Sequence, residues 1–310
     1  MTEVHPAPRR LATVTYLTYR GLAAGMGHLP EPLAEGVARG VARVMALRSG
    51  SPALTMSRRH IGRVLASECV DGVVPDPALV RRWSRRSFDS YARYWCDGAR
   101  LPYENEAGVR ARWRLQEGYE HLRAAVAGGR GMVMALPHVG SWEWGGYWLG
   151  LEGMPMTAVV ERLEPEQLFE WFVAKRAAMG LTAVPLGEGS GSTLLRALKA
   201  NKVAGLVSDR DMVGNGVEVE FFGERTTLPA GAATLALRTG APLLPVVVYS
   251  GPGNWHTGIV HPPLDTTRRG RLREDIARVT QDLAITFEHD IRAQPEQWHL
   301  YQPNWPSDPR

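Results

Sequence analysis

The stretch GMVMALPHVGSWEWGG, residues 131–146, decides the fold class. It opens with an apolar run over residues 132–137, which has the length of a buried strand and stops at His138. A helix is expected to begin near Ser141, a residue type that caps helices, and to carry Glu143 in its first turn. A strand that runs directly into a helix is the repeating unit of an α/β fold, so His138 is expected at the carboxyl edge of a sheet, where such folds bind ligands.

The same alternation of short apolar runs with helical patterns continues to the C-terminal end. Strands are predicted over residues 132–137, 156–160, 182–186, 203–209, 217–222, 243–249 and 256–260. Helices are predicted over residues 143–151, 165–179, 192–200, 230–239 and 271–293. Strands that alternate with helices favour an α/β fold with a mostly parallel central sheet flanked by helices.

Before about residue 130 the periodicity is helical instead. We therefore expect a helical, basic N-terminal region over residues 1–128 packed on an α/β core over residues 129–310, the two forming one structural domain of ordinary size. The first hundred residues contain fifteen arginines, no lysine and eight acidic residues, which leaves a net charge of −3 for the rest of a chain whose total is +4.

Those arginines are interleaved with apolar and aromatic residues at helical spacing, which is open to more than one interpretation. They are either an ordinary solvated helix surface or a surface attracted to anionic lipid headgroups. Nucleic acid is the least favoured partner, because the chain carries no recognised binding motif for it.

The cysteines, the N-terminus and the histidines narrow the class of protein further. Cys69 and Cys96 have neither metal-ligand spacing nor the density of a disulfide scaffold, which favours a reduced, cytoplasmic protein. We see no signal peptide and no run of about 20 apolar residues that spans a bilayer. The histidines lack zinc-binding spacing and no nucleotide-binding glycine motif occurs, so neither a metal nor a cofactor is expected.

His138 and Glu143 have the chemistry of a catalytic pair. A carboxylate beside a histidine fixes the tautomer of the ring and stabilises the imidazolium, which makes the other ring nitrogen a general base. A structural hydrogen bond is the plainer interpretation of the same pair, and the two residues alone do not decide between them.

The segment HVGSWE fits the H-x-x-x-x-[DE] block of the glycerolipid-type acyltransferases. Further blocks follow in order: AVVERLEPEQLFEWFVAKRAAMGL, LVSDRDMVGNGVEVEFFGERTTLPAG and IRAQPEQWHLYQPNW. In their order and spacing the chain resembles the bacterial lipid A biosynthesis acyltransferase family, and within it the phosphatidylinositol mannoside acyltransferase branch. The ending YQPNW, in place of a basic segment, favours that branch.

The resemblance implies transfer of a fatty acyl group from acyl-CoA, or from acyl carrier protein, to a hydroxyl of a glycolipid. His138 is the implied general base and Glu143 the residue that holds its imidazolium. No serine or cysteine nucleophile is needed, because the acceptor supplies the attacking hydroxyl. Acyl-CoA is thus a co-substrate, and no cofactor or metal is implied.

Four further residues are implied to bind substrate. Arg176 and Arg162 suit substrate phosphates, although an ion pair with a nearby glutamate explains either arginine as well. Asp209 and Asp211 follow a predicted strand, at the same edge as His138. They are expected to orient sugar hydroxyls or, for Asp209, the base, whereas a turn capped by a carboxylate is the plainer alternative.

The expected acceptor is a mannose hydroxyl of a phosphatidylinositol mannoside, with a lipid A-type or other glycolipid acceptor as the alternative. A catalytically inactive lipid-binding protein on the same fold is the alternative outside the enzymes. The expected location is peripheral, on the cytoplasmic face of the inner membrane, against an anionic surface.

Overall fold

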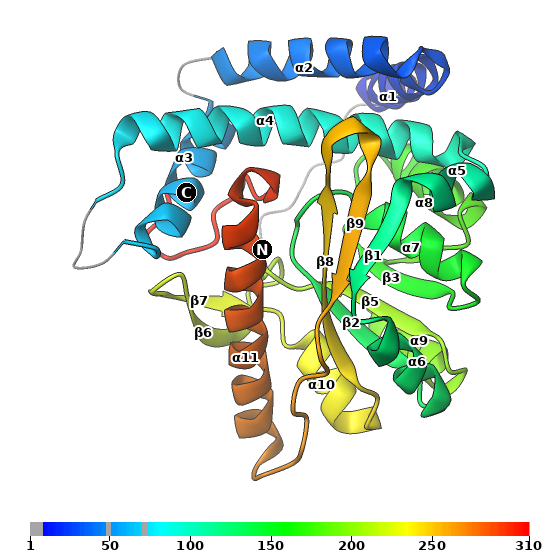
Figure 1. Cartoon of the computed structure of the whole chain (residues 1–310), viewed down its shortest axis with the longest axis vertical. Helices are drawn as coiled ribbons and strands as arrows, with labels where there is room; N and C mark the ends of the chain where they lie inside the picture. Colours follow the sequence, from blue (N-terminus) through cyan, green and yellow to red (C-terminus); the bar gives the residue numbers. More distant parts are fainter. Residues whose placement is uncertain (1–8, 48–50, 70–73, 310) are drawn as a thin grey trace.

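The computed structural model describes residues 9–47, 51–69 and 74–309. A central sheet carries helices on its faces, and a separate group of helices lies across one end of the strands (Figure 1). None of the helices within these described ranges is long and apolar enough to cross a membrane.

The sheet has seven strands in the order β1-β9-β8-β2-β5-β3-β4. Neighbouring strands are parallel except β8 and β9, which are antiparallel, so the expected mostly parallel sheet is confirmed. The strands are β1 Trp113–Glu117, β2 Met132–Leu136, β3 Met156–Val160, β4 Thr182–Pro185, β5 Val203–Val207, β8 Leu243–Ser250 and β9 His256–Val260. Every residue of the central strand β2 is buried, as its unbroken apolar run predicts.

The helices that cover the sheet begin and end within two residues of their predicted bounds. They are α7 Trp142–Leu151, α8 Glu166–Ala178, α9 Ser190–Lys199, α10 Gly231–Thr239 and α11 Leu272–Ala293. A further short helix, α6 Tyr119–Ala127, follows β1. Small residues let α10 sit close on the core, where Ala232, Ala233 and Ala236 are almost wholly buried.

Two strands were not predicted. β1 lies in the region expected to be helical and joins the sheet edge beside β9. β7 Glu224–Leu228 pairs antiparallel with β6 Val217–Phe221 in a separate hairpin beside α11 (Figure 1). Both missed strands are short and carry several polar residues on their exposed positions, so they lack the apolar run that marks the others. The proposed boundary at residue 128 stays a prediction.

The N-terminal helices form a layer above the end of the sheet (Figure 1). They are α1 Arg9–His28, α2 Glu31–Leu47, α3 Pro52–Ala66, α4 Pro77–Arg100 and α5 Glu106–Arg112; the 3₁₀ turn η1 Leu101–Tyr103 lies between α4 and α5, and β1 follows α5 directly. Ala34, Ala38 and Ala42 recur every four residues on α2 and are buried in one cluster with Phe88 and Ala92 of α4. The small alanine side chains allow the two helices to pack closely.

The C-terminal segment joins this helical layer to the sheet. After the 3₁₀ turn η3 Pro295–Gln297 the chain passes α3, where Asp308 accepts a hydrogen bond from His60 at 3.3 Å and lies 2.7 Å from Arg63. Another three-residue 3₁₀ turn, η2 Pro252–Asn254, connects β8 to β9. The last residues are thereby held against the carboxyl edge of the sheet.

Candidate active site

His138 lies two residues beyond the end of β2, at the edge where the sequence placed it. The following turn requires glycine, because Gly140 has φ +57° and an added Cβ would lie 2.0 Å from the backbone oxygen of Val248. The N–H of Gly140 donates to the oxygen of Gln297 at 3.0 Å. This tight turn fixes the direction in which the imidazole leaves the sheet.

Asp209 holds the imidazole. Strands β2 and β5 are parallel neighbours with Leu136 beside Val207, so the residues two positions further along each strand also face each other. The Asp209 Oδ1 lies 2.6 Å from the His138 Nδ1. The second ring nitrogen is left for a substrate, and the imidazole side chain is 36% exposed.

The other oxygen of Asp209 is also fully engaged. It accepts the backbone N–H of His138 at 2.9 Å and the indole N–H of Trp298 at 2.8 Å. The Asp209 side chain has no exposed surface, and its backbone oxygen accepts the side-chain amide of Asn304 at 3.1 Å. The carboxylate is therefore fixed in position by three donors from two different parts of the chain.

Burial and charge act in opposite directions on this pair. Burial alone lowers the pKa of His138, but the Asp209 carboxylate outweighs it and the net pKa is raised above 6.5. Burial alone raises the pKa of Asp209, but the imidazolium and the donors around the carboxylate outweigh it and the net pKa is lowered below 3.8. The arrangement stabilises an imidazolium next to a carboxylate, the charge state that a general base reaches during catalysis.

The expected contact between Glu143 and the imidazole is not the one observed. Glu143 lies in the first turn of α7, as predicted, but its Oε1 accepts hydrogen bonds from Arg176 at 3.0 Å and from Tyr94 at 3.3 Å. The residue that contacts His138 is Asp209, which was expected to orient either sugar hydroxyls or the base. The physical reason is register: a neighbouring parallel strand reaches the imidazole more directly than the next helical turn does.

Glu143 and Arg176 form a mostly buried ion pair beside the site. Their side chains are 8% and 14% exposed. The guanidinium lies 5.3 Å from the ring centre of Trp142 and 5.7 Å from that of Phe172, so aromatic faces enclose it on α7 and α8. The Oε2 of Glu143 and the Nε of Arg176 are buried without a hydrogen-bond partner, which leaves both with unused bonding capacity.

Asp211 and Arg162 make the structural contacts that were the alternatives to substrate binding, a capped turn for Asp211 and an ion pair for Arg162. Asp211 closes a turn, since its two oxygens accept the N–H groups of Val213, Gly214 and Gly216 at 2.7 to 3.1 Å. Arg162 is 56% exposed and pairs with Glu166 at 2.6 Å. Neither residue contacts the His138–Asp209 pair, and any role of theirs in substrate binding stays a prediction.

Ser141 begins α7 as its N-cap residue, but its hydroxyl does not cap the helix. It donates instead to the Oδ2 of Asp97 on α4 at 2.9 Å. Burial raises the pKa of Asp97 to about 7, against the opposing effects of Arg93 and of this hydrogen bond. The turn between His138 and α7 is thus tied to α4.

A second histidine, His299, lies behind the first. Its backbone N–H donates to the oxygen of His138 at 2.8 Å, and its Nε2 is 2.9 Å from the hydroxyl of Ser90 on α4. Burial, with a smaller effect of His138, lowers the pKa of His299 to about 3, so its ring is neutral at physiological pH. Helix α4 therefore contacts the site through Ser90, Tyr94 and Asp97.

Three residues near the pair received no site role from the sequence. Trp298 and Asn304 belong to the PEQW block and its YQPNW tail, which marked the family but gave no sign of their contacts with Asp209. Arg210 follows Asp209, is half-buried and has no hydrogen-bond or ion-pair partner in the described part of the chain. Its charge acts to lower the pKa of His138.

Within the described ranges, no group of three histidine, cysteine or acidic side chains is placed to hold a metal ion. No serine or cysteine there hydrogen-bonds to the His138 ring either, and its described partner is Asp209. A partly exposed imidazole held by a buried carboxylate at the carboxyl edge of an α/β sheet has the geometry that general-base activation of a bound nucleophile requires.

Comparison with known proteins identifies the kind of enzyme. The model of the bacterial lipid A biosynthesis acyltransferase family matches residues 3–307, and the chain belongs to this family. It is therefore an O-acyltransferase. It is similar to the phosphatidylinositol mannoside acyltransferase of Mycolicibacterium smegmatis, with 38% identity over 298 residues that cover 94% of this chain and 92% of that protein. It is also similar to the protein of the same name from Mycobacterium tuberculosis, with 39% identity over 271 residues that cover 86% of this chain and 81% of that protein.

Proposed function

We propose that this enzyme transfers a fatty acyl group from acyl-CoA to a mannose hydroxyl of a phosphatidylinositol mannoside. The relatives that carry this activity in their names align over most of the chain. The observation that carries the chemistry is the 2.6 Å contact between a buried carboxylate and an imidazole whose side chain is 36% exposed.

In the proposed mechanism the acceptor hydroxyl binds at the Nε2 of His138. As its oxygen attacks the thioester carbonyl, its proton passes to Nε2 and the imidazolium is stabilised by Asp209. The tetrahedral intermediate then collapses, the carbon–sulfur bond breaks, and the departing thiolate takes the proton back from the imidazolium. His138 is the catalytic residue, and Asp209 is a positioning residue that acts through it.

The pair of Glu143 and Arg176 is proposed to bind substrate beside the base. The Arg176 side chain keeps 14% of its surface exposed, and a guanidinium group suits a phosphate oxygen. Removing one partner of a buried ion pair leaves the other charge uncompensated, so substituting either residue is also expected to destabilise the fold. The two roles are separable by comparing kcat, KM and thermal stability.

A peripheral position on the cytoplasmic face of the plasma membrane is proposed as well. Helices α1 and α2 expose apolar side chains that are each at least 53% exposed: Val14, Leu17, Leu22, Leu33, Val37, Val41 and Val44. On α2 these residues recur at helical spacing, on a flank of the helix separate from its buried alanine face. An exposed apolar stripe with arginines nearby is typical of helices that lie in the headgroup region of a bilayer.

The test is mass spectrometry of products formed by the purified protein from a mixture of acyl-CoA donors and a phosphatidylinositol mannoside, with a lipid A precursor as competitor. The expected product is the mannoside carrying one additional acyl group, absent with His138→Ala. Acylation of the lipid A precursor alone would replace the proposed acceptor, and no transfer to either lipid would favour a lipid-binding protein.

A further inference from the structure

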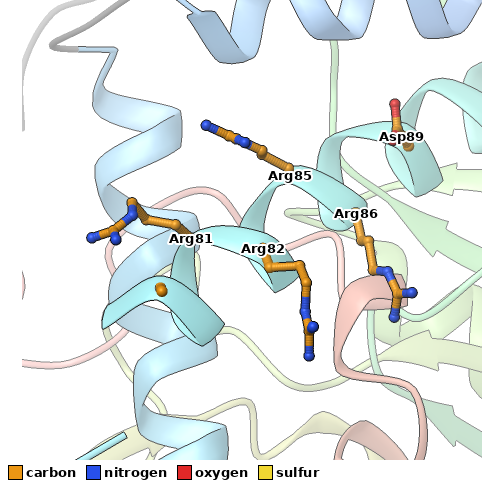
Figure 2. Close-up of a pocket in the computed structure, with 6 residues that line it drawn as sticks. Arg81, Arg82, Arg85, Arg86 and Asp89 are labelled. Carbon is orange, nitrogen blue, oxygen red and sulfur yellow. The ribbon is translucent and has the colours of Figure 1, made fainter. Parts of the chain in front are cut away.

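A groove lined by arginines lies on the first half of α4, outside the active site. Its walls come from one helix face, and its volume is about 470 Å³. Figure 2 shows Arg81 and Arg85 extending toward one side of the helix, and Arg82 and Arg86 extending together toward the other. The remaining lining residues are Ala78 and Asp89.

The four guanidinium groups of this groove have no carboxylate within 4.0 Å in the described part of the chain. Their one close described contact is with an aromatic ring, where the Arg86 guanidinium lies 4.9 Å from the ring centre of Trp83. Asp89, the acidic residue of the groove, lies 3.9 Å from Arg43 of α2 instead. Glu296 of η3 adds a longer-range attraction to Arg86. Four arginines with a single acidic residue among the lining residues still leave the groove positively charged.

Other arginines of α3 and α4, in contrast, are paired with carboxylates. Arg59 and Arg63 of α3 both lie within 3.3 Å of Asp308, and Arg93, further along α4, lies 3.8 Å from Asp97. Like charges four residues apart on a helix repel each other, as do Arg81 with Arg85 and Arg82 with Arg86. An anionic ligand in the groove would remove that repulsion.

The groove and the active site share one rigid element. Ser90 of α4 contacts His299 behind the catalytic histidine, and Tyr94 contacts Glu143. At about 1.5 Å per residue, Arg86 lies roughly 6 Å and Arg82 roughly 12 Å from Ser90 along the helix axis. A ligand long enough to reach from the imidazole past one or two helical turns would meet the arginines.

We propose that this groove binds the phosphate-bearing nucleotide end of the acyl-CoA donor, an inference that rests on the proposed function. Charge complementarity selects this ligand: the nucleotide end of coenzyme A carries a pyrophosphate and a further phosphate, whereas the phosphodiester of the acceptor carries a single charge. Guanidinium groups bind phosphate oxygens through paired hydrogen bonds, so Arg82 and Arg86, which extend together, match a ligand with more than one phosphate.

The test compares two donors that differ only in the nucleotide. Arg82→Gln combined with Arg86→Gln removes two charges from one side of the groove. It should raise the KM for acyl-CoA about tenfold, with kcat nearly unchanged, because the contacts are remote from the reacting atoms. With the acyl-pantetheine thioester of the same chain length, KM should not change.

A matched control removes the same charge elsewhere. Arg123 on α6 and Arg238 on α10 are exposed, and both helices lie at the end of the molecule away from α4 (Figure 1). Arg123→Gln combined with Arg238→Gln should leave both KM values as in the wild type. Calorimetric titration with free coenzyme A should show the same ranking, with about tenfold weaker binding to the groove variant alone.

Four results would overturn the proposal. Two are kinetic: an unchanged KM for acyl-CoA in the groove variant, or an equal rise in KM for both donors. Two are binding results: no binding of free coenzyme A to the wild type, or a groove variant that loses binding to phosphatidylinositol vesicles while its affinity for coenzyme A is intact. The last result would assign the groove to lipid headgroups. A wild type that binds coenzyme A through the groove but transfers no acyl group would contradict the proposed function and leave the groove assignment in place.

Discussion

Replacing Asp209 with asparagine should remove catalysis while keeping the shape of the site. The Oδ2 of Asp209 accepts two N–H groups, from the His138 backbone and the Trp298 indole. In the variant the amide oxygen must stay at that position, since an amide nitrogen there would face two donors. The NH₂ group is then turned toward the Nδ1 of His138, where the Oδ1 now lies.

An amide that donates to Nδ1 forces the ring proton onto Nε2, which is the nitrogen that must accept the proton of the acceptor. A base held in the wrong tautomer loses its contribution to the rate, about 10²- to 10⁴-fold. The assay is steady-state transfer from acyl-CoA to the mannoside. We expect kcat to fall by that factor, with the KM of both substrates nearly unchanged.

Asp209→Asn should also change how the thermal stability of the protein depends on pH. The raised pKa of His138 stabilises the fold below about pH 6.5, and this contribution is lost as the pH rises through the raised value. The lowered pKa of Asp209 stabilises the fold above about pH 3.8, and this contribution is lost as the pH falls through the lowered value. The Tm difference between wild type and Asp209→Asn should therefore be largest between those two values and smaller at pH 9.

Normal kcat in a folded Asp209→Asn protein would refute this reasoning. So would a kcat for Glu143→Gln far below that of Asp209→Asn, because it would return the orienting role to Glu143. A KM effect restricted to the glycolipid would instead support the substrate-binding role that the sequence first suggested for Asp209.

The remaining predictions concern the base, its neighbours and the membrane surface. His138→Ala should lower kcat about 10²-fold or more with Tm preserved, measured by transfer assay and thermal melting, and near-normal turnover would exclude the base assignment. Glu143→Gln should lose less activity than His138→Ala but lower Tm, because it leaves Arg176 without its buried partner; a loss of activity equal to that of His138→Ala would contradict this. Arg210→Gln should move the acidic limb of the kcat/KM profile to higher pH, since the positive charge that lowers the pKa of His138 is removed, and an unmoved limb would show that Arg210 does not act on the base. Co-sedimentation with vesicles should require phosphatidylinositol and weaken at high salt, and binding that ignores both would leave apolar insertion alone.

The part of the fold that the sequence predicted is the part whose signal is local. The core strands are short apolar runs, and their helices begin and end at breaks that are visible in the sequence. β1 and β7 were missed because each is stabilised by one neighbouring strand and alternates with exposed polar residues.

The candidate site shows the same division between local and distant information. The position of His138 at a strand end follows from its own neighbours in the sequence. Its partner does not, because Glu143 is close in sequence whereas Asp209 is 71 residues away and is brought opposite His138 by the register of β2 and β5. Which strands are neighbours in a sheet is a property of the whole fold, and a single sequence leaves several orders open.

Helix α4 positions both the proposed donor site and the catalytic base. Its second half contacts residues behind and beside His138, and its first half carries the arginine groove. A side-chain N-cap at Asp76 and the alanine face of α2 stabilise α4, so the distance between the two places is fixed by one helix and not by loops. A donor bound by its phosphates at one end of such a helix delivers its thioester to a defined position at the other. Contacts remote from the reacting atoms hold the donor equally in the ground state and the transition state, which is the reason that the groove variants are expected to raise KM and leave kcat nearly unchanged.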